Sequence, residues 1–214
     1  MSYLFKKIKQ YHIFIIPILL GRFLLMWRAF IYLRSIPGSG YRAYLGRAPK
    51  VFGIEYIKLG DNFRVGDGLW LHAIPQYNAF VYQPHVEIGE NFSASDHLHI
   101  ACCNKVTIGK DVLIGSKVHI TDHAHGTYSG QNQSTPYESP VARKLSSSGP
   151  VMIGDNVWIG DNVVVLPNTI IGSGSIIGAN SVVSKDIPSN VIAVGCPAKA
   201  IKVWSNENSE WINL

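Results

Sequence analysis

Residues 121–126, TDHAHG, bring together three side chains that can handle protons or metal ions: Asp122, His123 and His125. Histidine suits acid–base catalysis because the ordinary pKa of imidazole lies near neutrality, and a neighbouring carboxylate can orient the ring. The same residues could instead ligate zinc or be polar residues of a surface loop. The elements around the segment must decide among these interpretations.

The composition indicates a folded globular domain. The chain has 214 residues, of which 47% are hydrophobic and 15% charged, so a single domain with a real core is expected. The net charge of +5 suits an anionic cofactor or membrane surface, and no basic stripe interleaved with aromatics points to nucleic acid. Cys102, Cys103 and Cys196 form no C-x-x-C motif and are expected to be reduced.

The N-terminal part, residues 1–50, reads as an apolar and basic helical segment followed by a linker. Lys6, Lys7 and Lys9 precede an apolar stretch, 11–33, that contains Arg22 and Arg28. Charges near mid-membrane are costly, so a spanning helix is not favoured, and no small-residue cleavage site marks a signal peptide. Residues 1–34 are expected either to lie on a membrane face or to pack against the protein or a neighbouring subunit.

An apolar residue recurs every six positions from Ile57 onward. A period of six fits neither an α-helix nor simple strand alternation, but fits a parallel β-helix in which each unit is a short strand plus a turn. Three units close one triangular coil, so the repeat predicts about five coils. The repeated positions are Ile57, Phe63, Leu69, Val86, Phe92, Leu98, Val106, Val112, Val118, Ile153, Ile159, Val165, Ile171, Ile177 and Val183. In the first nine units a second apolar or small residue follows two positions later, at Leu59, Val65, Leu71, Ile88, Ala94, Ile100, Ile108, Ile114 and Ile120.

The repeat also divides the chain. The β-helix is expected over residues 51–203, and residues 204–214 form a C-terminal tail. Residues 121–150 interrupt the repeat and predict a protruding loop, and TDHAHG stands at its mouth. A long insertion in a compact domain is usually functional.

Two stretches resemble the hexapeptide-repeat acyltransferases, and the resemblance covers about residues 51–203. VMIGDNVWIGDNVVVLPNTIIGSGSIIGANSVVSKDIPSNVIAVGCPAKAIK resembles galactoside and maltose acetyltransferases. HIACCNKVTIGKDVLIGSKVHITDHAHG is closer to bacterial O-antigen and capsule O-acetyltransferases. The resemblance implies an all-β fold, the left-handed parallel β-helix, in a homotrimer that uses acetyl-CoA as acetyl donor, with each active site between two prisms.

The resemblance also implies site residues. Counting five positions from Ile120 puts the catalytic base at His125, favoured over His123, with Asp122 as the orienting group. Six residues carry over to the cofactor: Trp158, Gly160, Ala179, Ser184, Lys185 and Lys199. The acceptor pocket departs from the galactoside and maltose enzymes, because Ser95 stands at their asparagine position. Candidate acceptor contacts are Ser95, Asp96, His97, Tyr128, Tyr137 and Arg143.

The expected function is acetyl-CoA-dependent O-acetylation of a sugar hydroxyl in a cell-surface polysaccharide or in its precursor, either free or lipid-linked. The expected location is cytoplasmic, at the inner face of the cytoplasmic membrane. Alternatives are another small acceptor, such as an amino sugar, and a zinc-dependent carbonic-anhydrase-like enzyme using His119, His123 and His125. No metal is expected in the favoured interpretation, and a non-catalytic scaffold is the remaining alternative.

Overall fold

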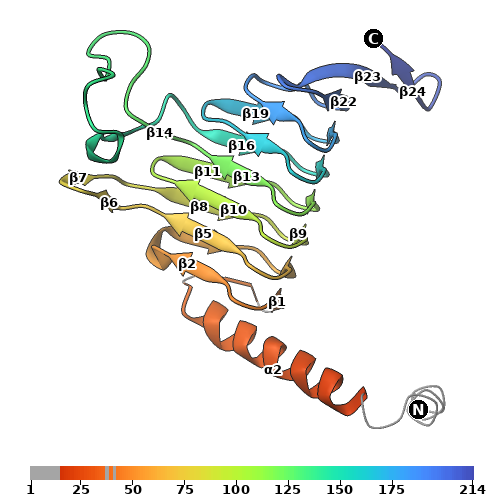
Figure 1. The fold of residues 1–214 in the computed structure, drawn as a ribbon. Coiled ribbons are helices and arrows are strands. Elements are labelled where there is room, and N and C mark those ends of the chain that lie inside the picture. Colours follow the sequence, from red (N-terminus) through yellow and green to blue (C-terminus); the bar gives the residue numbers. More distant parts are fainter. Residues whose placement is uncertain (1–14, 37–38, 41) are drawn as a thin grey trace.

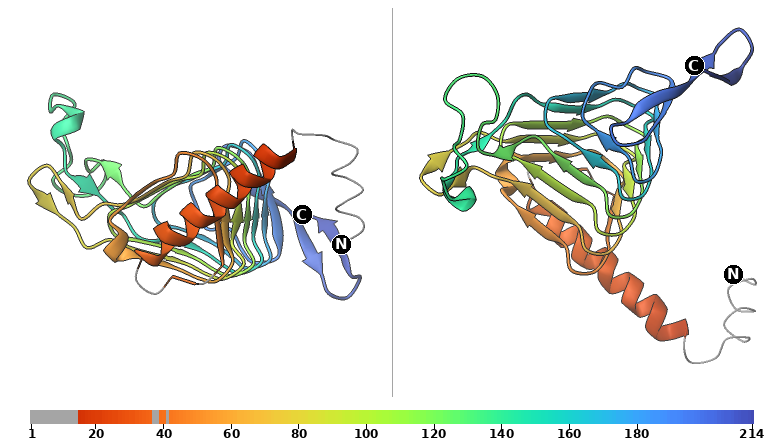
Figure 2. Two further views of the ribbon diagram at one scale, coloured as in Figure 1. Left: turned by 90° about the horizontal axis from the view of Figure 1, so that it is seen from below. Right: turned by 45° about the horizontal axis from the view of Figure 1, so that its top comes forward.

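The chain is a triangular prism of stacked coils with a helix across its N-terminal end (Figures 1 and 2). This computed structural model describes residues 15–36, 39–40 and 42–214. Helix α2 (Ile15–Arg34) precedes the coils, and three sheets, here called A, B and C, form the faces of the prism.

Each sheet collects one strand from each successive coil, and the strands within the prism are parallel. Sheet A contains β1 (Ala43–Leu45), β4 (Phe63–Val65), β9 (Ser93–Ala94), β12 (Leu113–Ile114), β17 (Trp158–Ile159), β20 (Ile176–Ile177) and β22 (Val191–Val194), extended by the antiparallel strands β23 (Lys199–Ser205) and β24 (Glu210–Asn213). Sheet B contains β2 (Lys50–Phe52), β5 (Trp70–Ala73), β10 (His99–Cys102), β13 (His119–Thr121), β18 (Val164–Val165) and β21 (Val182–Val183). Sheet C contains β3 (Ile57–Leu59), β8 (His85–Ile88), β11 (Lys105–Ile108), β16 (Val151–Ile153) and β19 (Thr169–Ile171).

The six-residue repeat forms the core as expected, because residues at the same repeat position stack inside the prism. On sheet B, Ile100, Ile120, Val165 and Val183 are in register and fully buried. No single coil can enclose such residues, so stability comes from stacking neighbouring coils. The repeat therefore makes a continuous apolar column, while the alternate side chains of each strand point outward.

The corners of the prism explain the small and polar residues between repeat positions. Asn62, Asn91, Asn156 and Asn162 have φ between 56° and 60°, a left-handed conformation that asparagine tolerates better than most residues. At Gly160 a Cβ would lie 2.7 Å from the backbone nitrogen of Ala179 in the next coil. Glycine is therefore required there for the coils to approach this closely.

Helix α2 confirms the predicted helical segment for the part that the structure describes. Ala29 and Leu33 are buried against the first coil, and Arg28 donates a hydrogen bond to the carbonyl of Gly46. The opposite face is exposed and apolar. Residues 1–14, with the three lysines, lie outside the described residues. Within the described chain, no helix is long and apolar enough to cross a membrane.

Two excursions leave the prism at the corner between sheets B and C. The predicted loop 121–150 protrudes from the prism (Figure 1), and the antiparallel pair β14 (Ala124–His125) and β15 (Leu145–Ser146) closes its base. The hairpin of β6 (Gln76–Tyr77) and β7 (Phe80–Val81) lies beside it. Tyr77 Oη donates to the carbonyl of Val141 over 3.0 Å, so hairpin and loop support each other.

Candidate active site

Asp122 lies at the centre of the TDHAHG segment, where β13 ends, and its side chain is fully buried. Its carboxylate accepts hydrogen bonds from the backbone N–H groups of Cys103, Asn104 and Lys105, at 2.9, 2.8 and 2.7 Å. These residues belong to the stretch Cys102–Lys105, in which two extra residues shift the frame of the six-residue repeat. The irregularity in the repeat therefore supplies the amides that hold one buried carboxylate.

The Asp122 carboxylate also holds the ring of His123, whose Nδ1 lies 2.8 Å from Oδ1. Burial raises the pKa of Asp122, but the hydrogen bonds from His123 and the backbone amides outweigh burial and leave that pKa below its ordinary value. An ionised carboxylate only accepts hydrogen bonds, so Nδ1 of His123 carries the proton. In the neutral ring the other nitrogen, Nε2, carries no proton and can accept one from a substrate.

Two thiols lie against the same carboxylate. Cys102 Sγ is 3.2 Å from Oδ2 of Asp122. Burial and the neighbouring Asp122 raise the pKa of Cys103 to about 12 and raise that of Cys102 further, so both thiols stay protonated. Both are free cysteines, as the sequence predicts.

The same group tests the zinc alternative. Ligand atoms of Cys103, Asp122 and His123 lie within 4.8 Å of one another. However, the two oxygens of Asp122 already accept four N–H hydrogen bonds, which uses the lone pairs of a carboxylate. His119, from the predicted zinc set, is hydrogen-bonded to His99. The residues fit a hydrogen-bonded dyad better than a metal centre.

His125 occupies a different environment from His123. It belongs to β14 at the base of the loop, its side chain is exposed, and its ring meets the edge of Tyr77 at a centroid distance of 5.1 Å. Its carbonyl accepts a hydrogen bond from Tyr128 Oη. In the structure His123 is therefore hydrogen-bonded to the carboxylate of Asp122, whereas His125 contacts the aromatic ring of Tyr77.

The loop residues proposed to contact acceptor sugar mostly hold the loop together. Arg143 is buried, and its guanidinium donates to the hydroxyl of Tyr128 and to the carbonyls of Thr135 and Glu138, at 2.8, 2.9 and 2.7 Å. Tyr137 is almost fully exposed. Arg143 and Tyr128 therefore fix the shape of the loop that carries His125.

Ser95, Asp96 and His97 lie at the corner where sheet A passes into sheet B. Asp96 Oδ1 accepts the backbone N–H of Asp67 at 2.7 Å, and His97 has a φ of 60°. Strand β10, of four residues, separates this corner from the Cys103 amide that holds Asp122. The structure therefore does not bring these three residues to His123 of the same chain.

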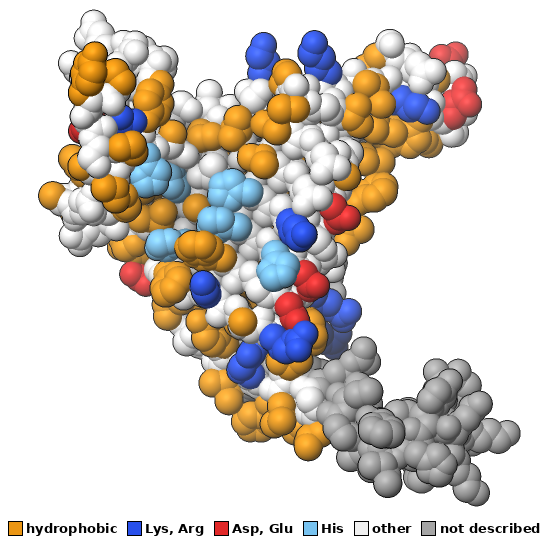
Figure 3. Space-filling model, viewed as in Figure 1, with side chains coloured by type: hydrophobic (Ala, Val, Ile, Leu, Met, Phe, Trp, Pro, Cys, Tyr) orange, Lys and Arg blue, Asp and Glu red, His pale blue; other side chains and the backbone are white. Residues whose placement is uncertain are grey.

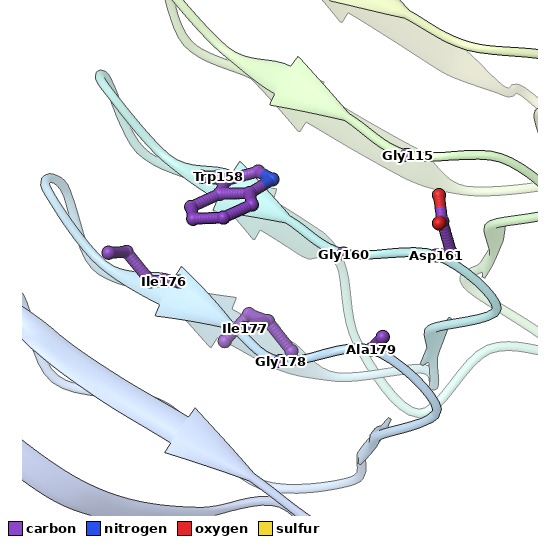
Figure 4. A pocket seen from close by; sticks show the side chains of 8 residues that line it. All are labelled: Gly115, Trp158, Gly160, Asp161, Ile176, Ile177, Gly178 and Ala179. Atoms are coloured by element: carbon purple, nitrogen blue, oxygen red, sulfur yellow. The ribbon is translucent and has the colours of Figure 1, made fainter.

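A groove of about 280 Å³ lies along sheet A and its corner with sheet B. It contains three of the predicted cofactor residues, and Figure 4 shows the outward ring of Trp158 over this surface. Ser184, Lys185 and Lys199 lie outside its lining, toward the carboxyl end. The lining residues are Gly115, Trp158, Gly160, Asp161, Ile176, Ile177, Gly178 and Ala179.

Five of these lining residues were missed by sequence reasoning, although the repeat carries a signal for them. Strand register puts Leu113, Trp158 and Ile176 on successive rungs of sheet A. Gly115, Gly160 and Gly178 follow these strands at the same corner. Extending the predicted Trp158 and Gly160 by one rung in each direction identifies most of the groove.

Comparisons with known proteins agree with this fold. A family model described as "Bacterial transferase hexapeptide (six repeats)" matches residues 150–185. A putative lipopolysaccharide biosynthesis O-acetyl transferase of Escherichia coli K12 is 46% identical over 156 residues, which cover 72% of this chain and 76% of that protein. The galactoside O-acetyltransferase of the same organism is 39% identical, over 64% of this chain and 62% of that protein.

A solved maltose O-acetyltransferase from Clostridium difficile 630 is 28% identical, with a TM-score of 0.52, and the match covers 79% of this chain and 71% of that chain. The chain therefore belongs to the bacterial hexapeptide-repeat acyltransferases. It is an enzyme, and the predicted left-handed parallel β-helix is confirmed as its fold.

Proposed function

We propose that this chain is an acetyl-CoA-dependent O-acetyltransferase acting on a sugar hydroxyl, with His123 as general base. The observation that carries the proposal is the buried Asp122 carboxylate, which fixes the tautomer of His123 through a 2.8 Å contact. We place the base at His123 rather than at His125, which the sequence count favoured, because the orienting carboxylate is on His123. His125 is left as a residue of the loop mouth.

The reaction follows from that geometry. Nε2 of His123 removes the proton of the acceptor hydroxyl as its oxygen attacks the thioester carbonyl. The new C–O bond forms, the C–S bond breaks, and the imidazolium returns the proton to the departing thiolate of CoA. Asp122 stabilises the imidazolium through Nδ1 and keeps the ring in place.

The groove around Trp158 is our proposed site for the acetyl donor. It offers an apolar wall from Trp158 and Ile176 and backbone amides near Gly160 and Ala179 to the pantetheine arm. Lys185 and Lys199, both exposed, remain our candidates for the CoA phosphates, with Ser184 beside them. The relatives named as O-acetyltransferases support acetyl-CoA as the donor.

A homotrimer is proposed because one chain keeps the two halves of the site apart. The groove lies on one edge of sheet B and His123 on the other, with β13 between Gly115 and Asp122. A strand of this length spans roughly 10 Å or more, which is too far for direct transfer. A neighbouring copy that brings its groove to His123 closes the gap.

The acceptor and the cellular location are also proposals. The relative named for lipopolysaccharide biosynthesis supports a cell-surface glycan or its lipid-linked precursor as acceptor. Such precursors are made at the inner face of the cytoplasmic membrane, and residues 1–34 are the proposed contact with that surface.

Replacing His123 by alanine tests the base directly. His123→Ala is expected to lower kcat for acetyl transfer by roughly 10²–10⁴-fold, because general-base catalysis contributes about that factor. Acetyl-CoA binding, measured by calorimetry, and the oligomeric state should not change. His125→Ala is the matched variant, and it should retain most of the activity. Full activity in His123→Ala, or its loss only in His125→Ala, would return the base to His125.

A further inference from the structure

Three further histidines lie on sheet B beside His123: His72, His99 and His119. A group of histidine side chains is visible on this face in Figure 3. Strand register puts Trp70, His99 and His119 on consecutive rungs. The Trp70 and His99 rings are stacked at 4.3 Å with an interplanar angle of 13°, and Lys50 Nζ lies 5.2 Å from the Trp70 ring centroid. The stack holds the His99 ring in a defined orientation.

His99 and His119 are joined through the same atom of each ring, since their Nδ1 atoms are 3.0 Å apart. Burial lowers the pKa of His99 to about 4, helped by the nearby His119, and burial also lowers the pKa of His119. Both rings are therefore neutral at neutral pH, and each carries a single N–H. A hydrogen bond between two Nδ1 atoms then needs one ring protonated at Nδ1 and the other bare there.

The Nε2 atoms of His99 and His119 therefore have opposite hydrogen-bonding roles. The ring that donates through Nδ1 has a bare Nε2, and the ring that accepts at Nδ1 has a protonated Nε2. Neither Nε2 has a hydrogen-bond partner within the described chain, and neither is a buried unsatisfied atom. The pair presents one donor and one acceptor to the solvent, on adjacent rungs of the sheet.

The pair is also close to the proposed base. Strand β13 begins at His119 and runs directly into Asp122 and His123. An electrostatic interaction with His123 contributes to the lowered pKa of both His99 and His119. The loop 121–150 and the β6–β7 hairpin rise at the same edge of sheet B.

We propose that His99 and His119 bind the acceptor next to His123 through hydrogen bonds to two neighbouring hydroxyls of one sugar ring. The protonated Nε2 donates to the oxygen of one hydroxyl, and the bare Nε2 accepts from the other. A vicinal diol satisfies both nitrogens, whereas an acceptor with an isolated hydroxyl or amine satisfies one. This assignment rests on the proposed O-acetyltransferase function and names specificity-determining residues for it.

The variants His99→Phe and His119→Phe remove the nitrogens while keeping a flat ring in the stack. Acetyl transfer is measured with methyl β-galactopyranoside and its monodeoxy analogues as acceptors. Each variant should raise the acceptor KM roughly 10-fold, as expected for one lost hydrogen bond, while the KM for acetyl-CoA stays unchanged. For the deoxy analogue that lacks the hydroxyl bound by the replaced histidine, the variant and the wild-type protein should have the same KM. His85→Phe, on sheet C, is the control and should change neither KM.

Ring-nitrogen NMR of histidine-labelled protein gives a second readout that does not need turnover. We expect His99 and His119 to appear as neutral rings of opposite tautomers, and both Nε2 signals to shift when the methyl glycosides are added at high concentration. Equal tautomers, unshifted signals with every glycoside, or an unchanged acceptor KM in both variants would overturn the inference. Failure of the wild-type protein to bind acetyl-CoA would instead overturn the proposed function.

Discussion

At the scale of single residues, the site depends on which side chains stay neutral and which stay charged. Asp122 remains ionised because three backbone amides and His123 donate to it. Burial lowers the pKa of His72, His99 and His119, so these rings stay uncharged. These neutral rings lack the carboxylate partner that His123 has, which is in line with our proposal of His123 as the base.

The lowered histidine pKa values predict a pH-dependent stability. The ring of His99 has a folded pKa of about 4, against an ordinary value of 6.5, and His72, His119 and His123 face it. Between these values the unfolded chain binds protons that the folded chain excludes, so stability is full above about pH 6.5 and falls toward pH 4. Protonation of Asp122 lowers the stability only at more acidic pH, because the pKa of Asp122 lies below the ordinary value of 3.8.

Thermal denaturation between pH 4.5 and 7.5 checks this prediction. The Tm of the wild-type protein should fall as the pH falls, and His99→Phe should flatten that dependence because one of the three titrating rings is gone. His85→Phe should leave the slope unchanged. An identical slope in wild-type protein and His99→Phe would show that His99 takes up its proton equally in both states.

At the scale of elements, α2 has one face packed on the protein and one exposed face. Ala29 and Leu33 pack on the first coil, so the expected packing against the protein is present. The other face exposes Leu20, Phe23, Leu24, Trp27 and Ile31, each more than half exposed. Residues 1–50 also carry nine of the 19 Lys and Arg and none of the 14 Asp and Glu. Three such basic segments repel one another in a trimer, whereas an anionic bilayer attracts them.

Vesicle flotation tests this reading of α2. The protein should bind vesicles containing phosphatidylglycerol, and binding should weaken with salt and be much weaker on pure phosphatidylcholine. The double variant Phe23→Glu/Trp27→Glu should lose most of the binding because it puts two charges on the apolar face. Val81→Glu, on the exposed hairpin, is the control. Unaltered lipid binding together with a broken trimer would make this face a subunit contact instead.

The elements also show how far sequence reasoning reaches. The core was predictable because three six-residue units close one coil, so each repeat position stacks on the equivalent position of the next coil, as Val183 does on Val165. The choice between His123 and His125 was not predictable by counting, because it depends on how the irregular Cys102–Lys105 stretch folds around Asp122. The hydrogen bond between Tyr77 and Val141 joins two segments that lie outside the repeat, so the repeat does not predict it.

At the scale of the whole molecule, the separation of groove and base within one chain gives a mixing test. In the proposed ring of three chains, each site would combine His123 of one chain with the groove of the next. Trimers mixed from His123→Ala and Trp158→Ala chains contain one site with both parts intact. Random mixing of equal amounts should restore about a quarter of the wild-type sites, although each variant alone is inactive.

The measurement is acetyl transfer after the two variants are unfolded and refolded together. Refolding each variant alone provides the control, and co-refolded wild-type protein sets the full value. Absence of any recovery in the mixture would mean that one chain supplies both the base and the groove. The same experiment reads out oligomerisation, because monomers cannot complement each other.

The way the prism ends has a consequence for solubility. A stack of parallel strands has two open edges whose unpaired N–H and C=O groups can template further chains into filaments. In this chain α2 lies across the first coil, and β23 folds back antiparallel on β22 at the last (Figure 1). The same helix thus covers the open edge of the first coil, so we expect its removal to expose the protein to polymerisation, in addition to abolishing the proposed membrane contact.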